Sequence, residues 1–221
     1  MPEEGAIPSR KDRKRAEIVA IAQQLFFREG YAGTSMSQLA AAVGGSKTTL
    51  YNHFQSKEEL LLAVVQDVVE PKPDDYDVGT EPTEFRAWLS WFGAATVKRL
   101  ASYNYISLQR LAAAEALRFP EIGKIFDEAV RPGYQMASEL FAEAMRKGLL
   151  RRADPQIVVE HFLELCCGWM LRRVIWNIQP TPTHAEIETN VRDAVSAFMD
   201  GYQSRSDGPS RKKRSRTHAA A

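Results

Sequence analysis

The sequence predicts an all-α protein, and three observations support this fold class. First, apolar residues recur at the period of an amphipathic helix near the N-terminus and again in the second half of the chain. Second, the alternation of β-branched and polar residues that is typical of strands and hairpins is missing. Third, hydroxyl residues stand three positions before Glu or Gln at the start of several apolar stretches, as in helix capping boxes.

Four helices are expected in the N-terminal part of the chain. The first carries an apolar stripe and ends at Gly30, because a glycine commonly follows the last turn of a helix. The next three begin at hydroxyl caps, and the fourth helix runs to about residue 69. The stripe comprises Ile18, Ile21, Ala22, Leu25 and Phe26, and the caps are Ser35 with Gln38, Ser46, and Ser56 with Glu59.

Residues 70–82 are rich in Pro and Asp and predict a loop. Pro132 and Gly133 are expected to split or kink a later helical stretch, because proline removes a backbone donor. The expected helices beyond the loop are 83–101, 104–117, 121–131, 133–148, 155–178 and 183–201. The start signals of the last two are Asp154 before Pro155, and Thr183 with Glu186.

Length and composition narrow the functional classes. The 221 residues suit one or two domains and are 44% hydrophobic and 26% charged, as in an ordinary soluble protein. No apolar run reaches the length of about 18 residues that predicts a membrane span, and the N-terminus lacks the order of a signal peptide. A cytoplasmic protein is therefore expected.

Cys166 and Cys167 are adjacent, which is poor geometry for a disulfide. No CxxC motif or histidine cluster accompanies them, so we expect core thiols, no metal and no cofactor.

Charge is unevenly distributed along the chain. Residues 10–57 carry eight Lys or Arg against three Asp or Glu, and residues 205–216 carry six against one, so each segment has a net charge of +5. Residues 58–204 have a net charge of −7, and the whole chain has +1. A basic end beside an acidic body fits a protein that presents one face to phosphate.

A helix-turn-helix motif is predicted over residues 34–54. Two short helices meet at Gly44, where a tight turn needs a positive φ. The first turn of the second helix presents unpaired N–H groups, and short polar side chains follow it, which suits phosphate and base contacts. The apolar residues that would pack this pair on the first helix are Leu39, Ala40, Val43, Leu50 and Phe54. DNA binding is therefore expected, and the alternative is a three-helix bundle with a solvated polar face.

This motif resembles the N-terminal domain of the TetR family of bacterial transcriptional regulators. The matching elements are Ala22–Phe26, Gly30 with Tyr31, Thr34 with Ser35, Leu39 with Ala40, Gly44 to Phe54, and Ser56 to Leu60. Gly45 departs from the valine that is usual in the family, which removes a small core contact. The resemblance implies phosphate contacts from Thr34, Ser35, Ser46, Tyr51, His53 and Lys57, with a core position as the alternative for Tyr51. It implies base contacts from Lys47, Thr48, Thr49 and Asn52.

The resemblance also implies dimerisation through the last two helices. The residues support this independently, because the predicted helix 155–178 is apolar on two sides, and one side can face a partner subunit while the other faces its own core. One side comprises Phe162, Leu165, Trp169, Arg172 and Trp176, and the other comprises Val159, Leu163, Cys166, Met170 and Val174. The predicted interface residues are Phe162, Leu165, Trp169, Trp176, Val191 and Phe198. The alternative is a central helix buried in a monomer.

A ligand pocket among the other helices is also implied by the resemblance. Aromatic residues across these helices suit flat apolar ligands, although aromatics at helical spacing are equally compatible with a core. The predicted pocket residues are Trp88, Trp91, Phe92, Tyr105, Gln109, Phe126 and Tyr134. Glu115 is expected to form a salt bridge with Arg110 or Arg118, or to bind a cationic ligand.

No enzyme is expected, because the chain lacks a phosphate loop, a nucleophile elbow, an HExxH motif and a dinucleotide fingerprint. The predicted function is a ligand-responsive repressor that binds a palindromic double-stranded DNA operator as a homodimer, with a small-molecule effector and no membrane partner. An activator, or a helical ligand-binding or interaction protein, is the alternative.

The chain is expected to divide into a disordered basic arm (1–11), a helix-turn-helix domain (12–69), a regulatory and dimerisation domain (83–201) and a disordered basic tail (204–221).

Overall fold

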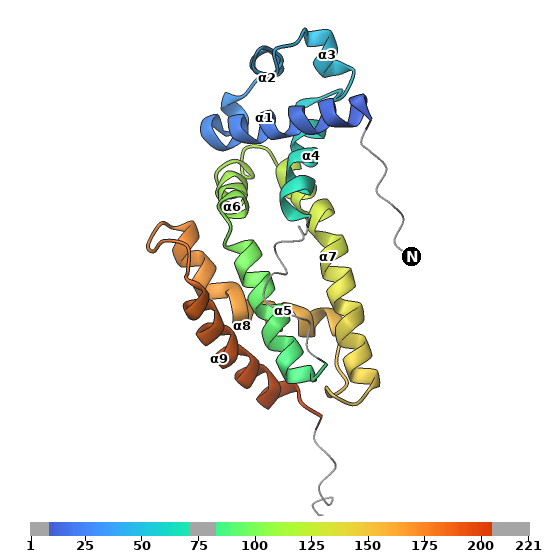
Figure 1. Ribbon diagram of the computed structural model, residues 1–221, viewed down its shortest axis with the longest axis vertical. Coiled ribbons are helices and arrows are strands. Elements are labelled where there is room, and N and C mark those ends of the chain that lie inside the picture. Colours follow the sequence, from blue (N-terminus) through green and yellow to red (C-terminus); the bar gives the residue numbers. More distant parts are fainter. Residues whose placement is uncertain (1–8, 71–82, 205–221) are drawn as a thin grey trace, which may run out of the picture.

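The computed structural model describes residues 9–70 and 83–204, and within these ranges the chain forms helices and no strand. The helices are α1 (Arg10–Gly33), α2 (Met36–Ala42), α3 (Lys47–Tyr51), α4 (Lys57–Val69), α5 (Phe85–Leu100), α6 (Tyr103–Glu115), α7 (Glu121–Arg146), α8 (Pro155–Ile175) and α9 (His184–Tyr202). In Figure 1, α2 and α3 form one tip of an elongated molecule, α1 lies beneath them, and α5, α9 and the last turns of α7 reach the other end, with α8 beside α5 and α9. The predicted all-α fold class is confirmed.

The first helix begins earlier than predicted. Ser9 caps α1 and forms a capping box with Asp12, so Arg10 and Lys11 are helical rather than part of a disordered arm. Residues 1–8 of the predicted arm lie outside the described part of the chain. Gly30 interrupts α1 as expected, with φ 77° and ψ 168°, a conformation that a residue with a Cβ rarely adopts.

The caps of the next helices match the predictions with one exception. Ser35 and Gln38 form the expected reciprocal capping box, and Ser46 accepts a hydrogen bond from the backbone of Thr49. Ser56 caps α4, but Glu59 accepts its bond from the backbone of Gln55, so the predicted box is only half formed. The start of each helix in this part of the chain is therefore fixed by local hydrogen bonds.

The predicted split at Pro132 and Gly133 into two helices is wrong, because α7 runs through both residues as one helix. Proline fixes φ at a value compatible with a helix, and its cost here is the missing N–H that would bond the carbonyl of Glu128. Packing of the apolar face of α7 against α4 and α8 outweighs that loss.

The last two helices begin at the predicted caps. Asp154 caps α8 with Pro155 in the first turn, and Thr183 forms a complete capping box with Glu186 at the start of α9. The end of α8 comes three residues before the predicted position, because Asn177 has φ 58° and turns the chain. Residue 204 is described, and residues 205–221 of the predicted tail lie outside the described ranges.

The buried apolar residues form two cores that do not divide at the predicted loop. We call α1–α4 the head and α5–α9 the body. One core joins α5, α8, α9 and the second half of α7. The other joins the whole head to α6 and the first half of α7, through Leu108, Leu111, Ile122 and Ile125. The head is therefore packed on the body through a shared core rather than tethered to it.

Candidate DNA interface and regulatory cavity

The helix-turn-helix lies at the tip of the molecule (Figure 1). Gly44 has φ 68°, as the turn between α2 and α3 requires, and no atom lies within 4 Å of a Cβ placed there. A Cβ at Gly45 would lie 3.4 Å from Cβ of Thr49, so the position that is usually valine in the family has room for a contact. The core residues predicted for this motif, Leu39, Ala40, Val43, Leu50 and Phe54, are all buried.

Most of the predicted DNA contacts are exposed on α3 and at its ends. Lys47, Thr48, Tyr51 and Asn52 face solvent, so Tyr51 is not a core residue. Ser35, also exposed, bonds Gln38, and Ser46 is exposed with its Oγ 3.1 Å from Oγ1 of the half-buried Thr49. This surface offers hydroxyl, amide and ammonium groups from one short helix and the turns beside it.

His53 is half-buried just beyond α3. Its Nδ1 is buried and has no hydrogen-bond partner among the described residues. A buried polar atom without a partner costs free energy, and in the described arrangement this atom is closed to groups outside the protein.

The structure contradicts one predicted phosphate contact, Thr34, and gives another, Lys57, additional bonds inside the head. Thr34 is 2% exposed, and its hydroxyl donates to the carbonyl of Gly30 at 2.8 Å, so this side chain closes the end of α1 instead of reaching solvent. The Nζ of Lys57 donates to the carbonyls of Tyr31 and Thr34 at 2.9 and 3.0 Å. Two of its three N–H groups therefore bind atoms inside the head. The ammonium caps the C-terminal end of α1, whose last turn contains no basic residue.

Tyr31 lies at the centre of these contacts. Its ring is 4.0 Å from the ammonium of Lys57, and its hydroxyl donates to Glu58 at 2.8 Å. Burial, and then this bond, raise the pKa of Tyr31. The ring also packs edge-on against Phe119 of the body at 5.1 Å between centroids. The sequence marks Tyr31 only as part of the family motif, because the partners of Tyr31 are distant in sequence.

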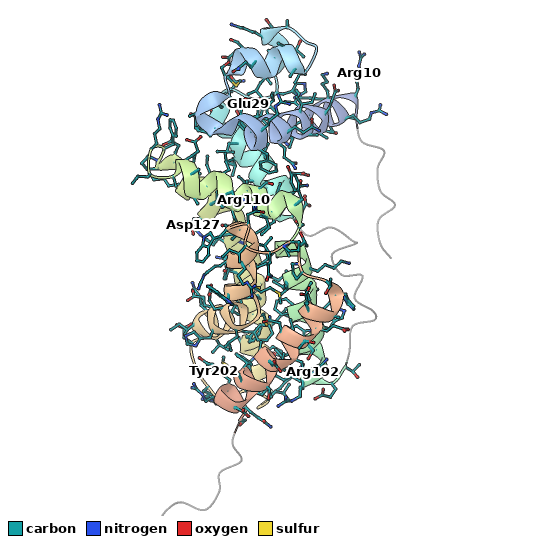
Figure 2. All side chains as sticks on the ribbon, turned by 90° about the vertical axis from the view of Figure 1, so that its left-hand side faces the viewer. Arg10, Glu29, Arg110, Asp127, Arg192 and Tyr202 are labelled. Carbon is teal, nitrogen blue, oxygen red and sulfur yellow. The ribbon has the colours of Figure 1, made fainter. Side chains whose placement is uncertain are left out.

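A basic group on the first two turns of α1 was missed as a site and noticed only as net charge. Lys14 lies 3.5 Å from the carbonyl of Val43, at the turn between α2 and α3, and the guanidinium of Arg15 lies over the ring of Phe54 at 4.8 Å. The members of the group are Arg10, Lys11, Arg13, Lys14 and Arg15. These cations extend the positive surface beside α3, and Figure 2 shows Arg10 at the free end of α1.

A cavity of about 400 Å³ lies between the last turn of α4 and helices α5, α6, α7 and α8. Three predicted pocket residues line it: Phe92, Tyr105 and Tyr134. The other four, Trp88, Trp91, Gln109 and Phe126, are not lining residues. Trp88 stacks on Phe92 at 5.2 Å within the body core, and Phe126 packs against the head core. Helical spacing alone could not separate these positions, because each aromatic residue follows the same apolar stripe as the lining residues.

The polar side chains of the cavity come from four helices, with Gln66 on α4, Arg99 on α5, Tyr105 on α6 and Tyr134 on α7. Nη1 of Arg99 donates to the carbonyl of Val69 at 2.6 Å, at the end of α4. Burial raises the pKa of Tyr105 and of Tyr134, so both hydroxyls remain protonated at neutral pH. The backbone beside Pro132 also lines the wall.

Helix α6 is bonded at two points to other helices. Arg110, labelled in Figure 2, donates from Nη2 and Nε to the carbonyls of Val174 and Ile175 at 2.7 and 2.8 Å, at the end of α8. Glu115 accepts a bond from the backbone N–H of Ala32 at 3.0 Å. The expected salt bridge of Glu115 to Arg110 or to Arg118 is not formed. Arg110 and Glu115 each bind the backbone of a different helix, and the guanidinium of Arg118 lies over the ring of Phe119. One helix of the body thus contacts both the end of α8 and the head.

Half of the predicted dimer-interface residues are buried within the protomer, so this half of the prediction is wrong. Phe162, Val191 and Phe198 are at most 1% exposed and belong to the body core, so they are not available to a partner. Trp169 and Trp176 are 62% and 58% exposed and pack edge-on at 6.1 Å, and Leu165 beside them is also exposed. The opposite stripe, with Val159, Cys166 and Val174, is buried as expected for a helix that is apolar on two sides.

The described residues offer neither a reactive thiol nor a membrane-spanning helix. Cys166 and Cys167 are free and buried, and burial raises the pKa of Cys166 to about 12, so the thiol is protonated and unreactive. No helix in residues 9–70 and 83–204 is both long and apolar enough to cross a bilayer.

An exposed helix-turn-helix at one tip, packed on a helical body, defines a DNA-binding transcriptional regulator. Residues 18–64 match the family model of the bacterial regulatory proteins of the tetR family, and residues 87–204 match that of the C-terminal domain of AefR-like transcriptional repressors. The chain belongs to the TetR family of transcriptional regulators.

Known proteins resemble the head in sequence and the whole chain in structure. The transcriptional activator FasR of Mycolicibacterium smegmatis is 41% identical over 56 residues, which are 25% of this chain and 26% of that protein. The repressor TetR of Mycobacteroides abscessus is 37% identical over 57 residues, 26% of this chain and 30% of that protein. These alignments therefore span less than a third of those relatives.

Two solved structures match along most of the chain. A TetR-family regulator from Mesorhizobium loti has a TM-score of 0.73 and 26% identity, over 89% of this chain and 100% of that one. The flavonoid-responsive regulator FrrA has a TM-score of 0.74 and 26% identity, over 87% of this chain and 98% of that one.

Proposed function

We propose that this chain is a ligand-responsive repressor that binds a palindromic operator as a homodimer in the cytoplasm. The observation that carries the proposal is the polar, exposed surface of α3 at the tip of the head, with an exposed apolar face on α8 and a cavity against the end of α4 in the same molecule. These features suit a duplex, a second copy of the chain and a small molecule, respectively.

In the proposed complex α3 enters the major groove with its N-terminal residues. Lys47, Thr48, Thr49 and Asn52 face the base edges, where hydroxyl and amide groups can read donor and acceptor patterns. Ser35, Ser46, Tyr51 and His53 meet phosphates beside the groove, and the basic group of α1 adds long-range attraction. Lys57 contributes by holding the end of α1 in place and has one N–H left for a phosphate.

The proposed dimer forms through α8 and the exposed side of α9. Neighbouring exposed tryptophans are unusual on a surface that stays in water. Burying them against a partner would release water from large apolar rings, which favours association. Isologous pairing of Leu165, Trp169 and Trp176 around a two-fold axis would place two heads on one side of the dimer. Two heads related by that axis require a palindromic operator.

The proposed ligand response uses the cavity, since its lining residues include Val69 at the end of α4 and Tyr105 on α6. Both helices are bonded to α1, through Lys57 and Glu115. A ligand that prefers a different position of these helices would shift the heads away from their fit to DNA. FrrA is described as flavonoid-responsive, which supports ligand control in a similar fold.

Repression is favoured by the match of the body to repressor C-terminal domains, whereas FasR, which resembles the head, is an activator.

Selection from a pool of random duplexes tests DNA binding directly. We expect enrichment of sequences with two inverted half-sites. Asn52→Ala and Thr48→Ala should change the preferred bases, at about 1–3 kcal/mol for each lost base contact. A pool that shows no enrichment after repeated selection would refute sequence-specific binding. The position of the enriched site relative to a promoter then separates a repressor from an activator.

A further inference from the structure

Among the described residues that line the cavity, one side chain is basic. Apart from Arg99 on α5, the walls are mostly aliphatic and aromatic, with Phe92, Leu140 and Leu163 on three different helices. Arg99 is half-buried, whereas the two acidic lining residues, Glu70 and Glu128, are exposed at the surface. Water and salt screen exposed carboxylates more than a half-buried guanidinium, so the inner part of the cavity favours an anion.

Arg99 caps the end of α4. Helix α4 has no basic residue in its last turn, and the guanidinium of Arg99 supplies the positive charge that a helix C-terminus favours. Its 2.6 Å bond to the carbonyl of Val69 is between two residues that both line the cavity. A bound molecule can therefore reach the atoms of this bond.

We propose that the cavity binds an elongated apolar molecule with one carboxylate, and that this carboxylate binds Arg99 in place of the carbonyl of Val69. This inference rests on the proposed ligand response and names its ligand class. A guanidinium binds a carboxylate through two parallel, charge-assisted hydrogen bonds, which are stronger than one bond to a neutral carbonyl.

Two further donors stand near the proposed carboxylate position. Tyr105 and Tyr134 also line the cavity, and the charge of Arg99 acts on the hydroxyl of Tyr105. Both hydroxyls are protonated and can donate to a carboxylate. The charge of Arg99, which is less screened than the exposed carboxylates, then favours an acid over an amine of equal length.

Binding in this mode would remove the cap from the end of α4. The first residue of α4, Lys57, holds the carbonyls at the end of α1, so α4 is bonded at one end to the cavity and at the other to the head. The ligand then favours an arrangement of α4 that differs from the one described, and only this difference in affinity can weaken DNA binding.

Calorimetry with a matched pair of probes tests the proposed site on the full-length protein without DNA. Decanoate and decan-1-ol have equal chains and differ in the carboxylate. We expect decanoate to bind at least tenfold more tightly to the wild type, and Arg99→Gln to remove that difference. Lys98→Gln removes a neighbouring charge that does not line the cavity and should preserve the difference. Arg99→Lys keeps the charge without the bidentate geometry and should preserve part of it.

Equal affinities for the two probes, no binding of decanoate to the wild type, or discrimination that survives in Arg99→Gln would overturn the proposed site. Release of the selected duplex by decanoate is measured separately. Tight, Arg99-dependent binding of decanoate with unchanged DNA affinity would confirm the carboxylate site and refute the ligand response on which the proposed function depends.

Discussion

The head and the body of this molecule present different kinds of surface. The head exposes short polar side chains on α3 and a row of cations on α1, which suit a charged, hydrated partner. The body exposes two tryptophans on α8, which suit a protein face, and a largely apolar cavity that suits a small molecule lies between the body and the end of α4. The polar surface of α3 and the apolar face of α8 therefore lie in different regions, and the cavity lies where the two regions meet.

The two regions are nevertheless one structural unit. The head core includes residues of α6 and α7, and polar bonds from Arg99 and Glu115 of the body reach α4 and α1. The division in surface chemistry therefore does not coincide with a division in packing.

Phe198→Ala should lower the free energy of unfolding by about 3–5 kcal/mol, because it removes a buried ring and leaves a cavity in the body core. Urea unfolding at several protein concentrations measures the effect. Trp169→Ala is the matched control on the exposed face of α8. It should leave the protomer folded and weaken the dimer, seen by light scattering. A larger loss of stability from Trp169→Ala than from Phe198→Ala would contradict the assignment of the two faces.

Lys57→Met should lower the free energy of unfolding by about 1–3 kcal/mol, because two carbonyls at the end of α1 lose a charged donor. Lys47→Ala, at the exposed start of α3, should leave stability unchanged and reduce the salt dependence of DNA binding by about one unit of slope. Thermal unfolding and binding titrations at several salt concentrations measure the two effects. If the two variants exchanged these phenotypes, the internal role of Lys57 would be wrong.

Glu115→Ala should cost about 1 kcal/mol, because the N–H of Ala32 loses its acceptor at the junction between body and head. Glu115→Gln keeps an oxygen acceptor and should cost less than half as much. The hydrogen exchange rate of the Ala32 amide reports the bond directly. Equal protection of this amide in the wild type and in Glu115→Ala would show that the contact does not hold α6 to α1.

Gly45→Ala should raise the free energy of unfolding by about 0.4–1 kcal/mol, because the new methyl group contacts Thr49 and restricts the unfolded chain. Gly44→Ala is the neighbouring control. It should destabilise the head by about 1 kcal/mol, because the left-handed φ of 68° strains any residue with a Cβ. Denaturant midpoints of the two variants should move in opposite directions.

The parts of the fold that depend on neighbouring residues were predictable from the sequence. Ser35 with Gln38 and Thr183 with Glu186 form their capping boxes, and Gly44 takes its positive φ, because each signal acts over only a few residues. The break at Pro132 was predicted from the same local rule and is wrong, since tertiary packing of α7 overrides the local cost.

The site residues were predictable where the motif itself determines which side chains are exposed. They were not predictable where the exposure of a side chain depends on partners distant in sequence. The residues of α3 are exposed as expected, whereas Thr34 and Lys57 bind carbonyls at the end of α1 that no spacing indicates. Phe162 follows the same stripe as Trp169, yet it is buried, because α5 and α9 cover only one edge of that stripe. The role of Arg99 depends on a contact with Val69, 30 residues away.

The central claim is that two copies of the head place α3 in successive major grooves of one duplex. Methylation protection on the selected duplex tests it most directly. The account predicts two protected major-groove patches, related by the symmetry of the site and separated by about 34 Å or a multiple of one helical turn. It also predicts that Trp169→Ala weakens protection of both patches together. A single protected patch, or two patches that respond independently to this substitution, would contradict the account.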